Sequence, residues 1–229
     1  MKIIDLKKKL GDFLLDIDFL EMETGKIHGI IGANGSGKTT VAKLMMGTLQ
    51  PDSGRIDYEG LSERDVTLTS QKPYLLHTSV YQNLIYPLKI RNAPIDEAQV
   101  DYWLERGGLQ DKKNQYARSL SSGEQQKLSF IRALIFKPKL IIIDETLSNL
   151  DPDSADLFEQ VILEQQAKDP ITWVTISHQL VHIKKICDVV HFMDKGQVVT
   201  SGTPEQMLIN PSHPAIIKYL SNTEVSFKK

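Results

Sequence analysis

The stretch KIHGIIGANGSGKTTVAKLMMGTL, residues 26–49, decides the fold. Its centre, GANGSGKT from Gly32 to Thr39, fits the pattern GxxxxGK[ST] at every fixed position. A β-branched run precedes this loop and a helical pattern follows it, which is the context that a phosphate-binding loop requires. Glycines let consecutive N–H groups face a phosphate, and the helix N-terminus adds a partial positive charge. The stretch therefore predicts a nucleotide site in an α/β fold.

Some residues of this loop are expected to bind the nucleotide, and one is expected to bind the metal. Lys38 can reach the β and γ oxygens of a nucleotide, and the Thr39 hydroxyl suits Mg²⁺, which prefers oxygen ligands. The alternative, a glycine-rich turn without a ligand, fits the complete pattern less well. The predicted nucleotide-binding residues of the loop are Gly32, Ala33, Asn34, Gly35, Ser36, Gly37, Lys38, Thr39 and Thr40.

Outward from the loop, short β-branched runs alternate with helical periodicity. This pattern favours α/β architecture with a largely parallel sheet, and LIIID, apolar on both faces, predicts an interior strand. Asp194–Gly196 predicts a tight hairpin turn, so an antiparallel piece is expected near the end of the chain. The expected strands are 26–31, 65–70, 140–144 and 173–177.

The domain organisation follows from length and from where the strand pattern fades. We expect one domain over residues 1–229, with a helical subdomain at about 72–137 inserted in the α/β core. Pro204 followed by Glu205 predicts the start of a short helix.

Composition limits the possible partners. The chain has 27 Lys+Arg against 29 Asp+Glu and a net charge of -2, so nucleic acid is not an expected partner. Cys187 is the single cysteine and cannot form an internal disulfide, and the opening MKIIDLKKKL lacks the apolar core of a signal peptide. Apolar runs are far shorter than the ~20 residues of a membrane helix, so a membrane role requires a partner chain.

Acidic and polar residues follow the predicted strands at the edge where open α/β sheets bind ligands. Asp144 is expected to hold Mg²⁺ through water, and Glu145 to orient and polarise the attacking water. Their alternative role is to cap the following helix. His178 follows the strand 173–177 and could contact the γ-phosphate, although a lone histidine is usually structural. Gln71 closes the strand 65–70 and could reach the metal or the water.

The segment LSSGE, residues 120–124, presents two alternatives. Ser121 and Glu124 are spaced as an SxxE capping box in front of an apolar-striped helix, which needs no ligand. The first turn of that helix nevertheless leaves N–H groups free, and Gly123 lets a ligand approach the backbone. These residues alone do not decide between a cap and a second phosphate site.

In order and spacing, these segments resemble the ATP-binding cassette of ABC transporters over essentially the whole chain. GANGSGKT resembles Walker A, Gln71 the Q-loop and LSSGE the signature. LIIIDE resembles Walker B, the segment from Ser148 to Asp151 the D-loop, and His178 the switch histidine. The expected fold is thus an ABC nucleotide-binding domain, a P-loop NTPase core with a mixed, largely parallel sheet, an antiparallel β piece and an inserted helical subdomain.

The resemblance implies an ATPase with ATP and Mg²⁺ as its ligands, working at the cytoplasmic face of a membrane. Two copies would pair head to tail, so that Ser121, Ser122 and Gly123 of one chain bind the γ-phosphate of the other chain's ATP. Asp151 would reach across the same interface. Gln71, Thr39 and Asp144 would serve the metal, while Glu145 and His178 would be catalytic.

Two departures from the family pattern matter. The most frequent family signature is LSGGQ, whereas this chain has Ser122 in place of the first glycine and Glu124 in place of glutamine. We therefore assign phosphate binding to Ser121 and Gly123 and capping to Glu124. The aromatic residue that usually stacks on adenine falls near Leu10, which cannot stack, so Phe13 is the candidate and no strong preference for ATP over GTP is predicted.

The implied partners are a second copy of the chain, membrane-spanning permease subunits that contact residues 72–83, and an extracytoplasmic solute-binding protein. The opening LGDFLLDIDF is similar to cassettes of tungstate and molybdate importers, so import of such an anion is expected. An amino-acid importer and an exporter are the alternatives. A cassette acting on DNA or ribosomes is the alternative of a different class, which the missing basic charge disfavours.

Overall fold

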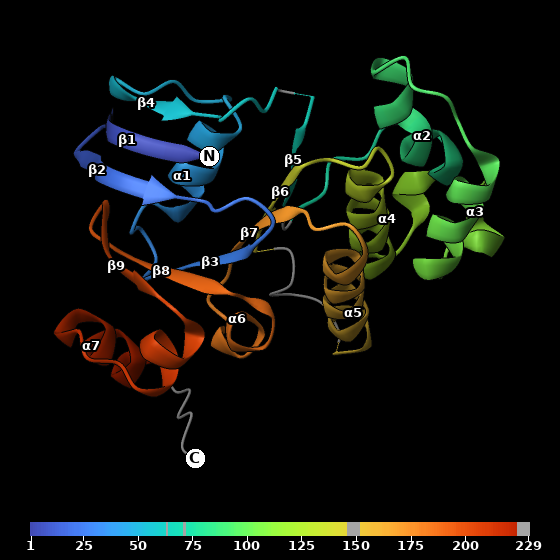
Figure 1. The fold of residues 1–229 in the computed structure, drawn as a ribbon. Helices are drawn as coiled ribbons and strands as arrows, with labels where there is room; N and C mark the ends of the chain where they lie inside the picture. Colours follow the sequence, from blue (N-terminus) through green and yellow to red (C-terminus); the bar gives the residue numbers. More distant parts are fainter. Residues whose placement is uncertain (63, 71, 146–151, 224–229) are drawn as a thin grey trace.

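The computed structural model describes residues 1–62, 64–70, 72–145 and 152–223, which form two sheets and several helices (Figure 1). The larger sheet has the strand order β5-β6-β7-β3-β8-β9, and its neighbours are parallel except for the antiparallel pair β8 and β9. The predicted α/β fold is therefore confirmed. The strands are β3 (Ile27–Ile31), β5 (Val66–Ser70), β6 (Leu140–Asp144), β7 (Thr172–Ile176), β8 (Val189–Asp194) and β9 (Gln197–Gly202).

Strand β6 shows why the pattern of apolar residues identified this sheet. It pairs with β5 on one side and β7 on the other, so the predicted interior position is confirmed. Ile141 and Ile143 pack into the core on one face of the sheet, while Leu140 and Ile142 pack into the core on the opposite face. A strand buried on both faces needs this continuous apolar run.

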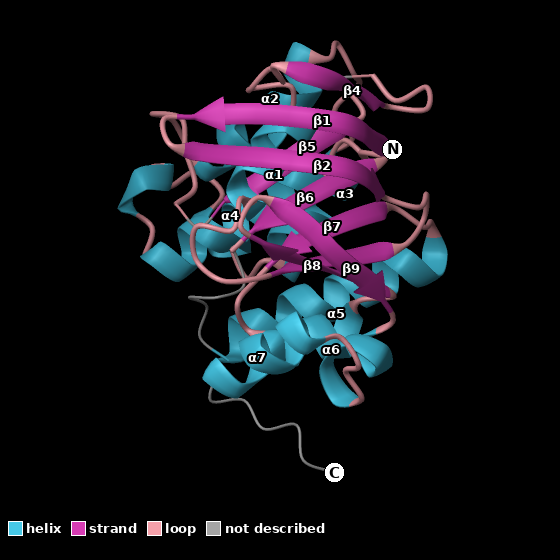
Figure 2. Cartoon of the chain, turned by 90° about the vertical axis from the view of Figure 1, so that its left-hand side faces the viewer, coloured by secondary structure: helices cyan, strands magenta, loops and turns pink. Residues whose placement is uncertain are grey.

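The smaller sheet is antiparallel, with the order β2-β1-β4, and the sequence pattern did not predict it. Its strands are β1 (Lys2–Leu10), β2 (Phe13–Glu21) and β4 (Ser53–Asp57). Antiparallel pairing was expected only at the hairpin of β8 and β9, which the structure confirms. Leu15 and Ile17 of β2 pack against α1 (Lys38–Met45), which lies between the two sheets (Figure 2).

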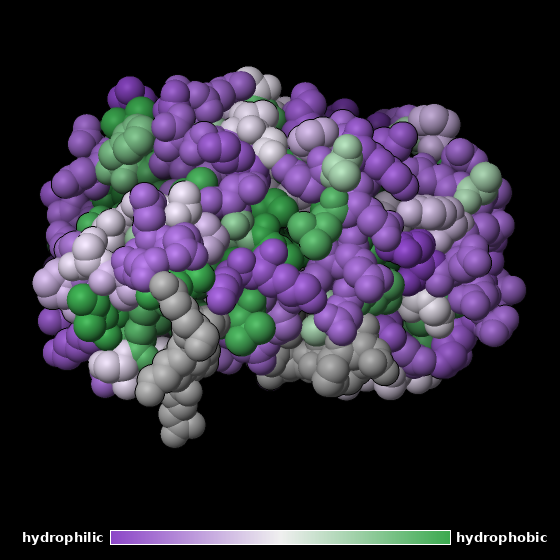
Figure 3. All heavy atoms as spheres, turned by 60° about the horizontal axis from the view of Figure 1, so that its bottom comes forward, coloured by the Kyte–Doolittle hydropathy of each residue, from purple (hydrophilic) through white to green (hydrophobic). Residues whose placement is uncertain are grey.

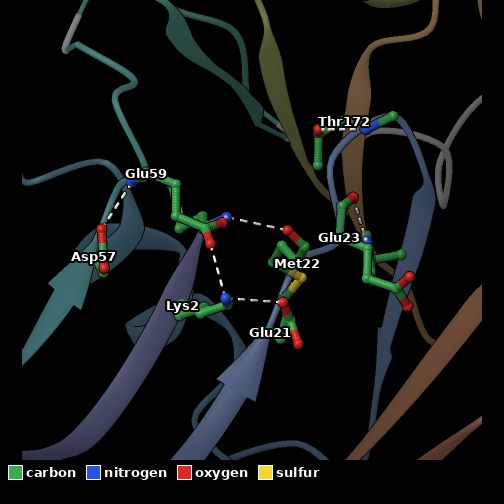
Figure 4. Close-up of polar contacts among 10 residues, drawn as sticks. Lys2, Glu21, Met22, Glu23, Asp57, Glu59 and Thr172 are labelled. Carbon is green, nitrogen blue, oxygen red and sulfur yellow. Dashed lines mark hydrogen bonds and ion pairs between the residues drawn. The ribbon is translucent and has the colours of Figure 1, made fainter.

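A carboxylate after β4 ties this sheet together at one end. Glu59 lies 2.9 Å from Lys2 Nζ and 2.6 Å from the Met1 amino group, and Lys2 lies 3.4 Å from Glu21 (Figure 4). Hydrogen bonds from the amino terminus and then from Lys2 lower the pKa of Glu59 to about 2. The ion pairs thus hold β1, β2 and the turn after β4 in one arrangement.

The helices between β5 and β6 gather at the side of the larger sheet that lies away from the smaller sheet (Figure 1). α2 (Val80–Ile90), α3 (Glu97–Arg106) and α4 (Ser122–Leu134) share one core with α5 (Pro152–Lys168) and α6 (Leu180–Ile186). The short helix expected after Pro204 is present as η4 (Glu205–Ile209), followed by α7 (Pro214–Asn222). The described part of the chain also contains the 3-10 turns η1 (Gln110–Lys112) and η2 (Ala117–Ser119).

Hydrophilic side chains dominate the face of the molecule in Figure 3, where apolar side chains form small separate groups. Of the helices in the described part of the chain, none combines the length and the apolar character that crossing a membrane requires.

Candidate functional site

Two glycines shape the loop that joins β3 to α1. A Cβ atom on Gly32, where φ is 150°, would lie 2.1 Å from the Met193 carbonyl oxygen. A Cβ atom on Gly37, where φ is 106°, would lie 2.8 Å from Leu15 Cδ1 and 3.0 Å from Phe13 Cζ. Both the left-handed backbone and the close neighbours require glycine at these positions. The sequence pattern predicted these glycines but not the residues that press against them.

The same loop is supported by the hairpin of β8 and β9. The Gly196 N–H donates to the Ser36 carbonyl oxygen at 3.0 Å. The Ser36 hydroxyl is buried and has no hydrogen-bond partner within the described part of the chain. A buried hydroxyl and a glycine-lined backbone fit a polar ligand such as a phosphate, because an unpaired buried polar group is costly.

Lys38 begins α1 and lies across the loop. Its Nζ donates to the carbonyl oxygens of Gly32 at 2.9 Å and Ala33 at 3.0 Å. Burial lowers the pKa of the Lys38 ammonium, and the negative charges of Glu145 and Asp144 oppose that shift. Lys38 is only 6% exposed, so water barely reaches its ammonium group. A bound anion beside the ammonium would therefore compensate its positive charge.

The start of α1 has the properties of an anion site. Its N-cap residue, Gly37, provides no side-chain hydrogen bond to the first turn. The first N–H groups of a helix need partners from outside the helix, and the helix dipole favours an anion there. The loop, Lys38 and the helix start therefore converge on one place for phosphate oxygens.

Two carboxylates lie at the carboxyl end of β6 beside this place. The Thr39 hydroxyl donates to Asp144 Oδ1 at 3.5 Å. Burial raises the pKa of Asp144, and the Thr39 hydrogen bond opposes that shift. The Thr39 hydroxyl and the Asp144 carboxylate are two oxygen donors within reach of each other, a set that suits Mg²⁺.

Glu145 has an unusual backbone for a residue with a side chain, since its φ is 52°. Its N–H donates to the Ile176 carbonyl oxygen at 2.9 Å, which fixes it against the end of β7. Glu145 Oε1 lies 3.6 Å from Nδ1 of His178, which follows β7. Strained backbone of this kind occurs often at functional sites. The fold thus brings together the acid and the histidine that the sequence singled out.

A cavity of about 510 Å³ is lined by part of the phosphate loop, the start of α1 and Glu145, whereas Asp144 and His178 are not among its lining residues. Phe13 forms part of its wall together with Leu10, so the candidate for base stacking lies beside the phosphate loop. The cavity is lined by Leu10, Phe13, Asn34, Gly35, Gly37, Lys38, Thr39, Thr40 and Glu145.

The second loop, residues 121–123, does not line this cavity. It starts α4, where the capping box is present in full: Ser121 Oγ accepts from the Glu124 N–H and Glu124 Oε2 accepts from the Ser121 N–H. The expected cap is therefore confirmed. Ser121 and Ser122 are nevertheless exposed, and the cap leaves other N–H groups of the first turn open to a ligand.

Glu124 has a partner that the sequence did not indicate. Its carboxylate pairs with Lys112, which donates to Oε1. This contact first, and the Ser121 N–H second, lower the pKa of Glu124. The expected contributions of Gln71 and Asp151 lie outside the described residues.

Comparison with known proteins places the chain among ABC transporter proteins. A family model described as "ABC transporter" matches residues 15–148. A tungstate uptake system ATP-binding protein of Peptoclostridium acidaminophilum is 34% identical over 203 residues, 86% of this chain and 95% of that protein. A methionine import ATP-binding protein of Listeria monocytogenes is 33% identical over 223 residues, 91% of this chain but 66% of that protein.

Solved structures share the fold. The cbiO1 chain of Clostridium perfringens, part of the ABC transporter complex cbiONQ, superposes with a TM-score of 0.77 at 24% identity, covering 97% of this chain and 94% of that chain. An ATP-binding subunit of an ABC transporter superposes with a TM-score of 0.83 at 23% identity, covering 96% and 98% of the two chains. The arrangement of the two sheets and the helices is thus that of known ATP-binding subunits.

Proposed function

The chain belongs to the ABC transporter family and is an ATP-binding ATPase subunit, and from this premise we propose how it works. Two copies close head to tail on two ATP molecules, hydrolyse them and reopen, and the motion drives solute through membrane-spanning permease subunits. The observation that carries this proposal is the separation of the two candidate phosphate sites. The second loop does not line the cavity at the start of α1 of its own chain, which supports its supply by a second copy.

Within one chain, the phosphates would lie along the loop from Gly32 to Gly37 and the start of α1. Lys38 would exchange its contacts with the Gly32 and Ala33 carbonyl oxygens for phosphate oxygens. The N–H groups of the first turn of α1, which has no side-chain cap, would supply further donors. Phe13 would provide a flat apolar surface for the base.

Thr39 and Asp144 would hold Mg²⁺, with Gln71 as a further ligand. Bound there, Mg²⁺ would neutralise phosphate charge and orient the β and γ oxygens. Glu145 would accept a hydrogen bond from the attacking water and align it. His178, 3.6 Å from the Glu145 carboxylate, would hold that carboxylate and contact the γ-phosphate.

The second loop and Asp151 of one copy would complete the site of the other copy. Ser121, Ser122 and Gly123 would place N–H and hydroxyl donors against the γ-phosphate at the start of α4. A group supplied in trans to a transferring phosphoryl group is worth about 10³ to 10⁵ in rate in other NTPases. Such a dependence links turnover to closure of the dimer.

The permease subunits would contact residues 72–83 at the cytoplasmic face of the membrane. This surface carries Tyr74, which is 70% exposed, and Tyr86 and Ile90 continue it along α2 with 42% and 54% exposure. Exposed aromatic and aliphatic side chains of this kind are enriched at protein interfaces.

The proposed solute is an oxyanion of the tungstate or molybdate type, delivered by an extracytoplasmic solute-binding protein. Support comes from the tungstate uptake protein, which matches at 34% identity over 95% of its own length. An amino acid is the second candidate, because the methionine import proteins are nearly as similar at 33% identity. Reconstitution with the permease from the same organism and uptake of radiolabelled tungstate, molybdate or methionine would separate these candidates.

A mixing experiment tests the head-to-tail dimer. Lys38→Ala damages the phosphate loop, and Gly123→Asp places a carboxylate where the partner's γ-phosphate would lie. Each variant alone has two damaged composite sites, whereas the mixed dimer has one site that contains both an intact Lys38 and an intact Gly123. We expect ATPase activity and MgATP-dependent dimers in the mixture only.

The matched control combines the two substitutions in one chain and mixes it with each single variant. Such mixtures contain no intact composite site, so they should remain inactive. Activity of the original mixture that does not exceed the sum of its separate components would contradict the head-to-tail dimer.

A further inference from the structure

Asn83, on α2, is completely buried and directs its side-chain amide to the residues after position 71. Its Oδ1 accepts from the Leu76 N–H at 2.8 Å. Its Nδ2 donates to the carbonyl oxygens of Leu76 at 3.2 Å and Ser79 at 3.0 Å. Residues 72–79, here termed the bracket segment, therefore fold around one side chain of α2 and should move with that helix.

Arg132, near the C-terminal end of α4, bonds to the same segment. Its Nη2 donates to the Tyr74 carbonyl oxygen at 2.7 Å, and its Nη1 donates to Asn83 Oδ1 at 3.2 Å. The two donors of one planar guanidinium thus hold the bracket segment and the residue around which it folds. This fork geometry belongs to arginine and is not available to lysine.

Arg118, which precedes the second loop in the chain, donates a further hydrogen bond to the bracket segment. Arg118 lies three residues before Ser121, and its Nε donates to the Leu75 carbonyl oxygen at 3.2 Å. The Arg118 guanidinium also lies 5.9 Å from the centre of the Tyr74 ring. The second loop is therefore flanked in the chain by two arginines that both hold the bracket segment.

The charge of Arg132 makes this contact sensitive to displacement. Within the described part of the chain, its guanidinium donates two hydrogen bonds, and both acceptors are neutral oxygens. Burial lowers the pKa of Arg132. A partly buried cation that loses its acceptors keeps the desolvation cost without the compensating bonds. Movement of the bracket segment away from α4 is therefore unfavourable, and movement together with α4 is favoured.

We propose that Arg132 is a positioning residue that makes α4, and the second loop at its start, follow the bracket segment. Ser121 and Arg132 belong to one continuous helix and its cap, about 16 Å apart along the axis at 1.5 Å per residue. A helix of this length moves as a rigid element. The inference rests on the proposed function, in which the second loop closes on the partner's ATP and the permease contacts the bracket segment.

The experiment compares Arg132→Met with Arg91→Met in the Glu145→Gln background. Arg91 is a matched control because it lines the same cavity as Arg132, burial also lowers its pKa, and its Nε and Nη1 donate to backbone carbonyl oxygens. Its acceptors, Arg64 and Pro87, lie outside the bracket segment. Light scattering during an ATP titration measures dimerisation, and a fluorescent ATP analogue at low protein concentration measures binding to the monomer.

For Arg132→Met we expect the ATP concentration at half-dimerisation to rise about tenfold, as loss of a charge-assisted hydrogen bond predicts. Binding of the analogue to the monomer should change by less than about twofold. With Glu145 intact, the ATP KM should rise by a similar factor while kcat at saturating ATP changes little, and Arg132→Lys should restore part of the KM because it retains one cationic donor. Arg91→Met should match its parent in each measurement.

The outcomes separate this inference from the proposed function. A Glu145→Gln parent that does not dimerise with MgATP overturns the proposed function and the link with it. A parent that dimerises while Arg132→Met dimerises equally well overturns the link alone. If Arg132→Met and Arg132→Lys each lose ATP binding to the monomer and dimerisation to the same extent, Arg132 serves folding. That result would also overturn the proposal that Arg132 makes α4 follow the bracket segment. A melting temperature of Arg132→Lys near that of the parent ensures that a folded variant is compared.

Discussion

Ser121 and Glu124 hold each other at the start of α4. The Ser121 N–H donates to Glu124 Oε2 at 2.9 Å, and the Glu124 N–H donates to Ser121 Oγ at 3.3 Å. Because the same carboxylate pairs with Lys112, its charge is compensated within the chain. Glutamate in place of the glutamine that is frequent in this family is therefore compatible with an anion nearby.

Replacement of the carboxylate alone should have little effect on dimerisation. Glu124→Gln keeps an oxygen for the Ser121 N–H and loses the ion pair, which is partly exposed. We expect the ATP concentration at half-dimerisation to change by less than about twofold and the free energy of unfolding by less than about 1 kcal/mol. Lys112→Met, which leaves an uncompensated carboxylate beside the second loop, should weaken dimerisation more. A tenfold effect of Glu124→Gln in an ATP titration would contradict this compensation.

Loss of the cap should instead destabilise the chain. Glu124→Ala removes the acceptor for the Ser121 N–H as well as the charge, so we expect about 0.5 to 1 kcal/mol less free energy of unfolding. Urea denaturation of Glu124→Ala and Glu124→Gln measures the difference. If both variants unfold at the same urea concentration, the hydrogen bond from the Ser121 N–H to the side chain of residue 124 does not contribute to stability.

Asp144 should lower the stability of the nucleotide-free chain. Its pKa is raised, so the folded chain binds its proton more tightly than the unfolded chain does, and the charged carboxylate costs stability at neutral pH. Asp144→Asn should therefore raise the melting temperature at about pH 7 without Mg²⁺ or ATP. The difference should narrow as the pH falls through the raised pKa of Asp144 toward the ordinary value of 3.8, because protonation then removes the charge from the folded chain.

The control for this pH dependence is Asp12→Asn, which changes an exposed aspartate. Its melting temperature should follow that of the unchanged chain throughout the titration. A lower melting temperature for Asp144→Asn at neutral pH would show that the Thr39 contact outweighs burial, contrary to the direction of the pKa shift.

Sequence patterns predicted the parts of the site that depend on local spacing. GANGSGKT, the acids that end LIIID and the Ser121–Glu124 box are each contained within a few residues. Their side chains occupy defined positions as soon as the strand or helix forms. Strands β3, β6 and β7 inside the larger sheet were predictable for a related reason, because burial on both faces favours a nearly continuous apolar run, whereas β5 lies at the edge of that sheet.

Contacts between distant segments could not be predicted. The Met193 carbonyl that excludes a side chain at Gly32 comes from β8, and Arg132 reaches Asn83 across 49 positions of sequence. The smaller sheet was missed because its strands bury one face only. In β2, alternation of Leu15 and Ile17 is interrupted by Phe19, which is apolar but 54% exposed. The alternation of apolar and polar residues within residues 13–18 was the sequence signal that could have predicted β2.

Glu145 and His178 should act as a unit in ATP turnover. Their side chains lie 3.6 Å apart, and both would serve the water and the γ-phosphate. We expect Glu145→Gln to lower kcat by about 10² to 10⁴ with little change in the ATP KM. His178→Ala should lower kcat as well, and the double variant should be no slower than Glu145→Gln, because coupled residues are not additive. If the losses in kcat of the two single variants multiply in the double variant, Glu145 and His178 act independently and the prediction is wrong.

Phe13 should bind the base of the nucleotide without selecting it. Its ring forms a wall of the cavity beside Gly37 and offers an apolar face, and stacking on an aromatic ring tolerates every base. Phe13→Ala should weaken the binding of ATP and of GTP about tenfold each, since loss of stacking costs about 1 to 3 kcal/mol per base.

Tripolyphosphate, which has no base, should bind the unchanged chain and Phe13→Ala equally well. This competitor distinguishes lost stacking from a distorted phosphate loop. Leu14→Ala is the matched control, because Leu14 is exposed and does not line the cavity. Equal weakening of tripolyphosphate would assign Phe13 to the support of Gly37, whereas loss of ATP binding alone would reveal hydrogen-bonded recognition of adenine by other residues.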